Sequence, residues 1–386
     1  MVYPEYIDSI IKRLEAHGES AYIVGGSLRD TLLGKTPHDY DVATSALPEK
    51  TVEIFSDKRV IETGIKHGTV TLIWDGEPVE ITTFRVDGSY TDSRHPDAVS
   101  FTSDIVADLS RRDFTVNAMC YNDNCGLIDL FGGIDDIKAK TLRAVGDAKS
   151  RFCEDALRIL RLFRFSATLE FSIEKNTFEA AVKYAPLLSN ISAERIFSEL
   201  QKAALGNNVT ALSPLLFTDA LADYCLKNAD LSNITKLEKR DNLRLFSLLN
   251  LTSYDFKKTL DAFKCSNIFK EYCLKMNYLS KAVISSDKIC IKKALNFAGL
   301  DIVNDILLYY RDILNTDITN HKLLLDEILK NKEPYKISQL DISGTDIVDL
   351  GYNGKTVGEK LEFLLNEVIE NPDLNHRRKL LNLICN

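Results

Sequence analysis

The sequence lacks the features that mark zinc-binding, secreted or membrane-spanning proteins. Its eight cysteines include no CxxC pair and no zinc-like spacing, and its six histidines form no cluster of metal ligands. No apolar stretch is long enough to span a bilayer, and no basic-then-apolar signal segment opens the chain. We therefore expect no membrane association, and reduced thiols in the cytoplasm.

An excess of basic residues is also absent. Lysine and arginine total 48 against 56 aspartates and glutamates, for a net charge of −8. A polyanionic partner must therefore be met by a local basic patch. The 386 residues allow two to four packed units, and 45% hydrophobic content is typical of a soluble globular protein.

What the sequence does contain is a strand–turn–helix–strand unit near its N-terminus. The apolar segment Ala21 to Val24 predicts a buried strand, and the glycine pair ending at Gly26 leads into a helix. Bare backbone N–H groups at the start of a helix favour phosphate binding. Arg29, one helical turn after Gly26, can hold a phosphate through two hydrogen bonds.

Two aspartates follow in the next predicted strand, Asp39 to Ala43. Side chains two positions apart in a strand point to the same side, so Asp39 and Asp41 direct two carboxylates at one place. Such oxygen ligands suit Mg²⁺, which fills its remaining positions with water and substrate phosphates. An isolated Asp-x-Asp is common on solvated strand ends. Next to a phosphate site, it predicts nucleotidyl transfer.

Strand signals end early in the chain. Further strands are predicted at Gly68 to Trp74 and Val79 to Phe84, and the polar stretch 87–99 predicts an exposed loop. From Glu154 onward, helical periodicity predominates, beginning with a helix over 154–165. The pattern predicts an α/β head followed by a long, mainly helical body.

Four strings in this order carry a family resemblance: GGSLRD with DYD, RRDFTVNA, RFCEDALRILRLFRF at 151–165, and ISAERIFSEL at 191–200. With them, the chain resembles the class II CCA-adding enzymes (tRNA nucleotidyltransferases), in the polymerase-β-like group that also contains bacterial poly(A) polymerases. The strong matches cover roughly residues 21–200, and the segment containing Asn375 matches more loosely.

The resemblance implies an α+β fold. A polymerase-β-like nucleotidyltransferase head (mixed sheet with helices) would span 1–140. An all-helical neck for base recognition (141–207), a body (208–330) and a tRNA-binding tail (331–386) would follow. The implied activity is template-independent addition of C, C and A to the 3′ end of tRNA. The tRNA 3′-hydroxyl attacks the α-phosphate of CTP or ATP, and pyrophosphate leaves.

The resemblance also implies roles for the acidic residues. Mg²⁺ would be held by Asp39 and Asp41, lowering the pKa of the hydroxyl and neutralising charge at the attacking and leaving oxygens. Glu80, on a neighbouring predicted strand, is the candidate third carboxylate, and a solvated strand acid is an equally open interpretation.

Nucleotide binding is expected from both the head and the predicted helix. Gly26 and Arg29 should hold the triphosphate. Arg112 should reach the nucleotide, Asp113 can accept from a ribose hydroxyl, and Asn117 assists or makes an internal hydrogen bond. The remaining candidates recur at spacings of three and form a slowly turning polar stripe on the helix: Asp155, Arg158, Arg161 and Arg164.

Asp155 and Arg158 also match the bases that the family adds. A carboxylate only accepts hydrogen bonds and a guanidinium only donates them. Cytosine and adenine present an amine donor beside a ring-nitrogen acceptor, whereas uracil and guanine present the reverse. A mismatch costs roughly 1–3 kcal/mol for each unpaired group. The pair therefore predicts selection of C and A without a template.

A lysine-rich window at 257–293 is the best candidate for tRNA contact. It holds nine lysines and three acids, and lysine suits sequence-independent phosphate contact. Solvated helix faces are the alternative. From this window we define the lysine cluster: Lys257, Lys258, Lys264 and Lys270. Near the C-terminus, Arg377 and Arg378 form a second candidate.

Three other functions remain to be weighed. A poly(A) polymerase would share the head and neck, but the strongly basic C-terminal extension of those enzymes is missing. The loop at 87–99 keeps Arg94, His95 and Asp97, which favours full CCA addition, although an A-adding tRNA nucleotidyltransferase stays open. Retention of Asp39, Asp41 and the helix arginines disfavours a non-catalytic RNA-binding relative. The sequence leaves the oligomeric state open.

Overall fold

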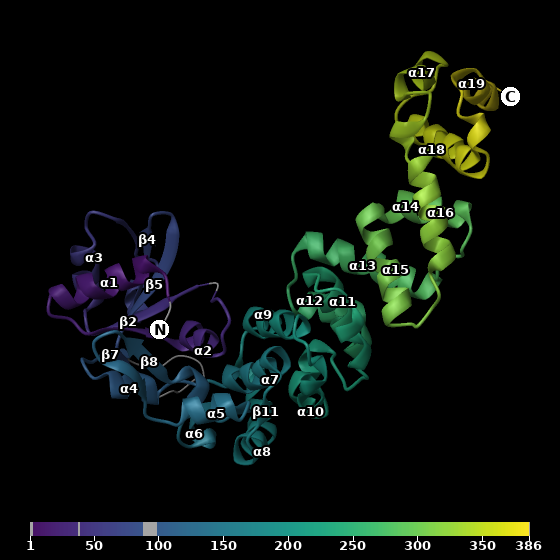
Figure 1. Ribbon diagram of the computed structural model, residues 1–386. Helices are drawn as coiled ribbons and strands as arrows, with labels where there is room; N and C mark the ends of the chain where they lie inside the picture. The colour runs from purple at the N-terminus through teal and green to yellow at the C-terminus, as the bar shows by residue number, and fades with distance from the viewer. Residues whose placement is uncertain (1–2, 38, 88–98, 386) are drawn as a thin grey trace. The chain divides into compact units, whose positions relative to one another are not determined.

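The computed structural model describes residues 3–37, 39–87 and 99–385. The chain forms two compact units, Met1–Asp230 and Leu231–Asn386, which follow each other from purple to yellow in Figure 1. The boundary between them lies inside the segment 208–330 that we expected to be one body. The finer division into head, neck, body and tail stays a prediction. Arg94, His95 and Asp97 lie outside the described residues.

The first unit is built on a mixed seven-stranded sheet with the order β3-β4-β5-β2-β1-β8-β9. Its strands are β1 (Ala21–Val24), β2 (Asp41–Thr44), β3 (Arg59–Ile61), β4 (Thr69–Trp74), β5 (Glu77–Thr83), β8 (Met119–Asn122) and β9 (Gly126–Asp129). Strands β2 and β5 run parallel, and the other neighbours in this sheet run antiparallel. This arrangement, with the helices that follow, confirms the α+β prediction.

Two smaller strand pairs and the helices complete this unit. The pairs are β6 (Arg85–Asp87) with β7 (Val99–Phe101), and β10 (Thr141–Leu142) with β11 (Ser172–Ile173). The α-helices are α1 (Glu5–Ala16), α2 (Gly25–Leu32), α3 (Pro48–Ile54), α4 (Ile105–Ser110), α5 (Gly133–Lys138), α6 (Ala148–Glu154), α7 (Leu157–Leu169), α8 (Lys175–Tyr184), α9 (Ala193–Ala204) and α10 (Ser213–Leu216). Short 3-10 helices are η1 (Ile65–His67), η2 (Thr115–Asn117), η3 (Ala185–Asn190), η4 (Val209–Leu212) and η5 (Asp219–Tyr224).

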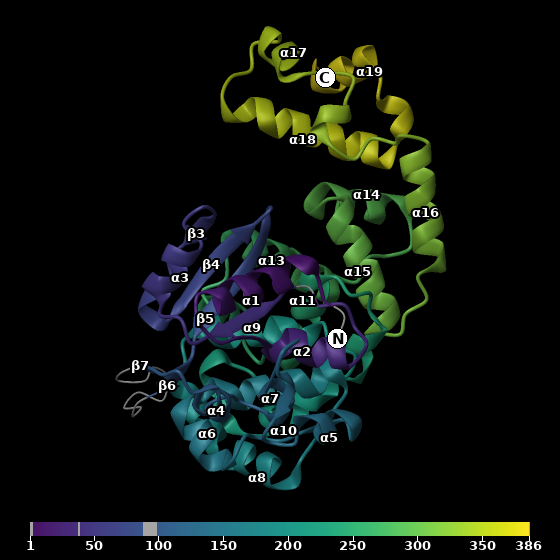
Figure 2. The ribbon, with the colours of Figure 1, turned by 60° about the vertical axis from the view of Figure 1, so that its left-hand side comes forward.

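The apolar patterning explains how these elements pack. Helix α1 buries Ile7, Ile10, Ile11 and Leu14, which recur at the spacing of one helical face. It lies beside α3 against the sheet, as Figure 1 and Figure 2 show. Alternation along β5 buries Val79 and Ile81 and leaves the intervening Glu80 for the opposite face.

Two boundaries differ from the sequence prediction. Strand β2 begins at Asp41, so Asp39 precedes the strand instead of opening it. The single helix expected over 154–165 is wrong: α6 ends at Glu154, and Asp155 is extended, with φ −135° and ψ 103°. The reason is local, because the Asp155 carboxylate accepts the Leu157 N–H at 3.0 Å and so caps the start of α7.

The second unit is helical, and its described residues contain no β-strand. Its α-helices are α11 (Asp241–Thr252), α12 (Phe256–Ala262), α13 (Asn267–Ala282), α14 (Lys288–Ala298), α15 (Leu300–Asp312), α16 (Thr319–Lys330), α17 (Gly344–Asp349), α18 (Lys355–Glu370) and α19 (Arg377–Cys385), and its 3-10 helices are η6 (Ser232–Lys236), η7 (Ile337–Gln339) and η8 (Pro372–Leu374). Helices α17, α18 and α19 enclose an apolar core that includes Ile347, Leu364, Val368 and Leu380. Across both units, none of the helices traced in the described ranges is apolar over a length that would cross a bilayer.

Candidate functional site

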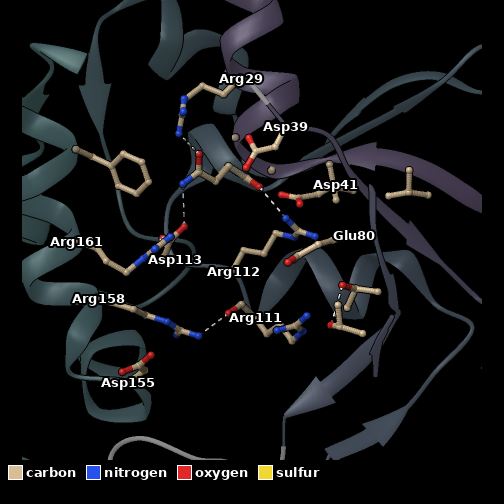
Figure 3. A pocket seen from close by; sticks show the side chains of 18 of the residues that line it. Arg29, Asp39, Asp41, Glu80, Arg111, Arg112, Asp113, Asp155, Arg158 and Arg161 are labelled. Atoms are coloured by element: carbon tan, nitrogen blue, oxygen red, sulfur yellow. Dashed lines mark hydrogen bonds and ion pairs between the residues drawn. The ribbon is translucent and has the colours of Figure 1, made fainter. Parts of the chain in front are cut away.

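A cavity of about 510 Å³ opens in the first unit, between the sheet and helices α2 and α7. Figure 3 shows side chains from the sheet, from the segment after α4 and from α7 pointing into it. Its lining includes every residue predicted for the metal or the nucleotide: Gly26, Arg29, Asp39, Asp41, Glu80, Arg112, Asp113, Asn117, Asp155, Arg158, Arg161 and Arg164. Arginines outnumber carboxylates in this lining, seven to five, which favours an anionic ligand.

Three carboxylates gather on one side of this cavity (Figure 3). The parallel pairing of β2 with β5 sets Asp41 directly opposite Glu80. Burial, with Glu80 and Asp39 close by, raises the pKa of Asp41 to about 6, although Arg112 opposes the rise. Carboxylates that repel one another in this way fit a site for a cation.

The donor set matches a hard divalent ion that is shared with a substrate. Among the residues that the structure describes, no group of three acidic, histidine or cysteine side chains is already arranged around one ion. An ion bound by Asp39 and Asp41 would therefore complete its shell with water or phosphate oxygens, as Mg²⁺ does in phosphate-transferring sites.

Gly25 opens α2 beside these carboxylates, and the position requires glycine. Its φ is +71°, in the left-handed region, and a Cβ there would lie 3.2 Å from Arg112 Nη1 and 3.5 Å from Asp41 Oδ2. No side chain caps the start of α2. Gly25 and Gly26 line the cavity, so the N–H groups at the start of this helix can serve to bind an anion there.

A hydrogen-bonded chain links α2 to α7 across the cavity. Arg29 Nη1 donates to Asn117 Oδ1 at 2.8 Å, and Asn117 Nδ2 donates to Asp113 Oδ1 at 3.1 Å. Asp113 Oδ2 accepts from Arg161 Nε at 2.9 Å and from its Nη2 at 2.6 Å (Figure 3). Both oxygens of Asp113 thus already serve the protein, and the internal hydrogen bond considered for Asn117 is present.

This chain fixes the charge of Asp113. The side chain is buried, and burial alone would raise its pKa. Arg161, together with the hydrogen bonds from Asn117 and Arg161 itself, lowers the pKa to about 2. Asp113 is therefore ionised near neutral pH, as a fixed counter-ion for Arg161.

Asp108, on α4, is a site residue that the sequence interpretation missed. Its buried carboxylate binds Arg111 Nη2 at 2.7 Å and Arg112 Nη2 at 3.1 Å. Burial raises the pKa of Asp108, but the two arginines bring it below its usual value. The spacings i,i+3 and i,i+4 were the available signal. The buried Nε of Arg112 has no hydrogen-bond partner among the described residues.

Asp155 and Arg158 both line the cavity, but not as neighbours on one helix. Asp155 Oδ2 accepts from Arg195 Nη2, on α9, at 2.9 Å. Arg158 donates to the Glu154 carboxylate at 2.7 Å and to the Arg111 carbonyl at 2.8 Å. Each carboxylate oxygen retains a second lone pair, and the guanidinium retains further N–H groups. Both can therefore still bind a base edge.

The stripe of arginines is neutralised more fully than the sequence indicated. Arg164 Nε donates to Glu199 Oε2, on α9, at 2.8 Å, and Asp113 balances Arg161. The acids that neutralise Arg161 and Arg164 therefore lie outside the string 151–165. Phe165 was also missed: its ring lies 3.5 Å from the Arg164 guanidinium carbon and 5.1 Å from that of Arg29, measured to the ring centroid.

In the second unit, much of the predicted basic charge is paired. Within the lysine cluster, Lys258 binds Asp255 at 3.0 Å and Lys270 binds Asp261 at 2.9 Å. Other lysines of the window 257–293 bind acids that lie beyond it: Lys288 with Glu327 and Glu333, Lys292 with Glu333, and Lys293 with Glu370.

The two arginines near the C-terminus differ in whether an acid pairs with them. Arg377 pairs with Asp346, whereas Arg378 is exposed. The role of these arginines and of the lysine cluster in binding tRNA stays a prediction.

Comparison with known proteins gives the same picture over nearly the whole chain. Residues 21–143 match the family described as poly A polymerase head domain, and residues 170–231 match the probable RNA and SrmB-binding site of polymerase A. The CCA-adding enzyme of Enterococcus faecalis is 35% identical over 387 residues, covering 96% of this chain and 93% of that protein. That of Streptococcus pyogenes is 41% identical over 305 residues, covering 76% and 73%. The crystal structure of the Bacillus stearothermophilus CCA-adding enzyme in complex with CTP is 30% identical and superimposes with a TM-score of 0.82, over 98% of this chain and 96% of that one.

Proposed function

This chain belongs to the CCA-adding enzyme family, and on that basis we propose that it adds C, C and A to the 3′ end of tRNA without a template. The substrates are CTP and ATP, and pyrophosphate is released. One observation carries the proposal: a single cavity joins the Asp39, Asp41 and Glu80 carboxylates to an arginine-lined wall. That combination serves transfer of a nucleotidyl group.

Enzymes of this family use a divalent metal, and we propose Mg²⁺, held by Asp39 and Asp41 with Glu80 as the third carboxylate. A bound ion would neutralise charge at the attacking and leaving oxygens. The first turn of α2, from Gly25 and Gly26, and the side chains of Arg29 and Arg112 hold the triphosphate. Arg112 lines the cavity beside Gly25, where a Cβ would lie 3.2 Å from its Nη1.

Base selection belongs to Asp155 and Arg158 at the other end of the cavity (Figure 3). Their remaining acceptor and donor sites complement the amine and ring nitrogen of cytosine and adenine and oppose uracil and guanine. Asp113 and Asn117 act indirectly on the nucleotide, because their hydrogen bonds hold Arg161 and Arg29 in place.

The helical second unit binds the rest of the tRNA in this proposal, through the lysine cluster and through Arg377 and Arg378. We retain the four-part division into head, neck, body and tail for these tasks. The cysteines, all of them unpaired thiols, favour a reducing compartment, and we propose the cytoplasm.

The test is incorporation into tRNA that lacks its 3′ CCA, with CTP alone, ATP alone, or both. We expect addition to stop after CC with CTP alone, to proceed to CCA with both, and not to start with ATP alone. Addition of A only to tRNA that already ends in CC would indicate an A-adding enzyme. Long A tails on unrelated RNA would indicate a poly(A) polymerase. Tight tRNA binding without any incorporation would indicate a non-catalytic relative.

A further inference from the structure

The second unit contains a cavity of its own, about 280 Å³ in volume, where α11, α13 and α15 meet. Its lining combines two asparagines, Asn250 and Asn277, with aromatic rings and a lysine. The proposed function gives this cavity no role. Its composition differs from an ordinary gap between helices, because polar side chains converge on its inner end.

Hydrogen bonds at that inner end form an ordered chain. Asn277 Nδ2 donates to Asn250 Oδ1 at 2.7 Å, and Asn250 Nδ2 donates to the Tyr309 hydroxyl at 2.9 Å. Tyr309 is only 2% exposed, and its ring packs on Phe246 with centroids 5.5 Å apart. The orientation of each group in the chain is therefore set by its neighbours.

The groups at the two ends of this hydrogen-bonded chain have unused hydrogen-bonding capacity. The Tyr309 hydroxyl accepts from Asn250, but its own hydrogen has no acceptor within the described ranges, and Asn277 Oδ1 accepts no hydrogen bond there. Burial raises the pKa of Tyr309, against a smaller lowering from Asn250, so the hydroxyl keeps its proton near neutral pH. A buried donor without a partner is unfavourable unless a ligand or water satisfies it.

The remaining lining supplies rings and a cation. Tyr254 is 61% exposed, and Phe256 lines the cavity with it. Lys281 is exposed and, unlike Lys275 on the same helix, binds no carboxylate in the described part of the chain. Rings that accept a flat base and a lysine that meets a phosphate are the usual parts of a site for a single-stranded nucleotide.

We propose that this cavity binds one nucleotide, with the base edge on Tyr309 and Asn277, the base against Tyr254 and Phe256, and a phosphate near Lys281. The observations favour an unpaired nucleotide of the tRNA substrate as the occupant, because the cavity is lined by Lys281, an exposed lysine of the window 257–293 that binds no carboxylate among the described residues. This inference rests on the proposed function for the identity of the RNA. It assigns to the second unit a contact with a base, beyond the sequence-independent phosphate contacts.

Tyr309→Phe removes the donor without changing the packing, and Tyr310→Phe is its matched control. Tyr310 is equally buried, but its hydroxyl lies outside the cavity, where it donates to the Leu279 carbonyl at 2.6 Å and accepts from the Ile284 N–H at 3.0 Å. We expect Tyr309→Phe to raise the Kd for tRNA lacking CCA about threefold to tenfold. Thermal unfolding of both variants shows whether stability changes as well. If destabilisation were the cause, Tyr310→Phe would weaken tRNA binding at least as much.

A second pair of variants tests the phosphate contact. Lys281→Gln should lower the slope of log K against log salt by about 0.7–0.9, while Lys275→Gln should leave it unchanged. Lys275 is the appropriate control because it lies on α13 and is already paired with Glu271 at 2.7 Å.

Two measurements identify the source of the nucleotide. Chemical probing of bound tRNA should show one unpaired base that is protected by the wild type and reactive with Tyr309→Phe. In the other arm, the wild type is titrated with CTP or ATP in the absence of tRNA. Binding of two nucleotides, with the second abolished in Asn277→Leu, would assign the cavity to a free nucleotide.

The inference is overturned if Tyr309→Phe and Lys281→Gln bind both tRNA and free nucleotides as the wild type does. Wild-type incorporation is measured separately, so the two proposals can fail separately. An inactive wild type whose tRNA affinity depends on Tyr309 would refute the proposed function and support the cavity.

Discussion

Asp113→Asn should destabilise the first unit by an amount that depends on pH. The substitution keeps the shape of the side chain and one acceptor oxygen, but it removes the charge that faces Arg161. Lowering the pKa of Asp113 from 3.8 to about 2 corresponds to about 2–3 kcal/mol of folding free energy near neutral pH. Loss of one partner from a buried ion pair sets an upper range of about 3–5 kcal/mol.

The pH dependence has a defined sign. The pKa of Asp113 is lower in the folded protein, so its stabilisation is fully present above the unfolded pKa and is lost as pH falls toward about 2. Linkage with these two pKa values leaves about half of this stabilisation at about pH 3. The difference between wild type and Asp113→Asn should therefore be constant from about pH 6 to 8 and decrease below about pH 4.

The protein provides its own probe for this measurement. Trp74, the single tryptophan, lies on β4 of the first unit, where its ring meets that of Phe55 edge-on. Urea unfolding followed by tryptophan fluorescence therefore reports on the unit that contains Asp113. Asp135→Asn is the control, since that exposed carboxylate forms a surface ion pair with Lys138 at 3.3 Å and should contribute less than about 1 kcal/mol. A stability of Asp113→Asn equal to that of the control at pH 7 would refute the reasoning.

Three further outcomes follow from the site and the second unit. Asp39→Ala or Asp41→Ala should abolish incorporation in the presence of Mg²⁺ while leaving tRNA affinity and Trp74-monitored unfolding near the wild-type values; near-normal incorporation would refute the metal assignment. Asp155→Ala should weaken the use of CTP and ATP together and increase incorporation of U and G relative to C, and unchanged selectivity in competition assays would place base reading elsewhere. Neutralising the lysine cluster should weaken tRNA binding and leave nucleotide affinity unchanged. The slope of log K against log salt should fall by about 0.7–0.9 for each phosphate that a lysine no longer neutralises, whereas a wild-type slope would identify the cluster as a solvated face.

The sequence was most informative where local patterning and function coincide. The apolar segment located β1 at Ala21–Val24, and the glycine pair led into the expected helix, α2. Residues from three separate strings, among them Asp41, Arg112 and Arg161, line one cavity. Short motifs can be recognised in this way because several of their polar side chains converge on one cavity.

Long-range pairing could not be read from the sequence. Nothing in the strings shows that Arg195 binds Asp155 across 40 positions, or that Glu333 forms ion pairs with lysines of the window 257–293. The net positive charge of that window therefore overstated its capacity for phosphate, because the neutralising acids lie outside it. A charge count along the chain predicts a surface only when the counter-ions are local.

The break at Asp155 determines how Asp155 and Arg158, the residues proposed to select the base, are positioned. Had 154–165 been one helix, the spacing of three would have set Asp155 relative to Arg158. Instead, α9 reaches the stripe at two points one helical turn apart on its own surface, with Arg195 bound to Asp155 and Glu199 bound to Arg164. This gives the string ISAERIFSEL a physical role that its sequence alone did not reveal. Because both contacts come from one helix face, we predict that a shift of α9 would move Asp155 and Arg164 together, which would couple the proposed base selection to nucleotide binding through tertiary contacts instead of helical periodicity.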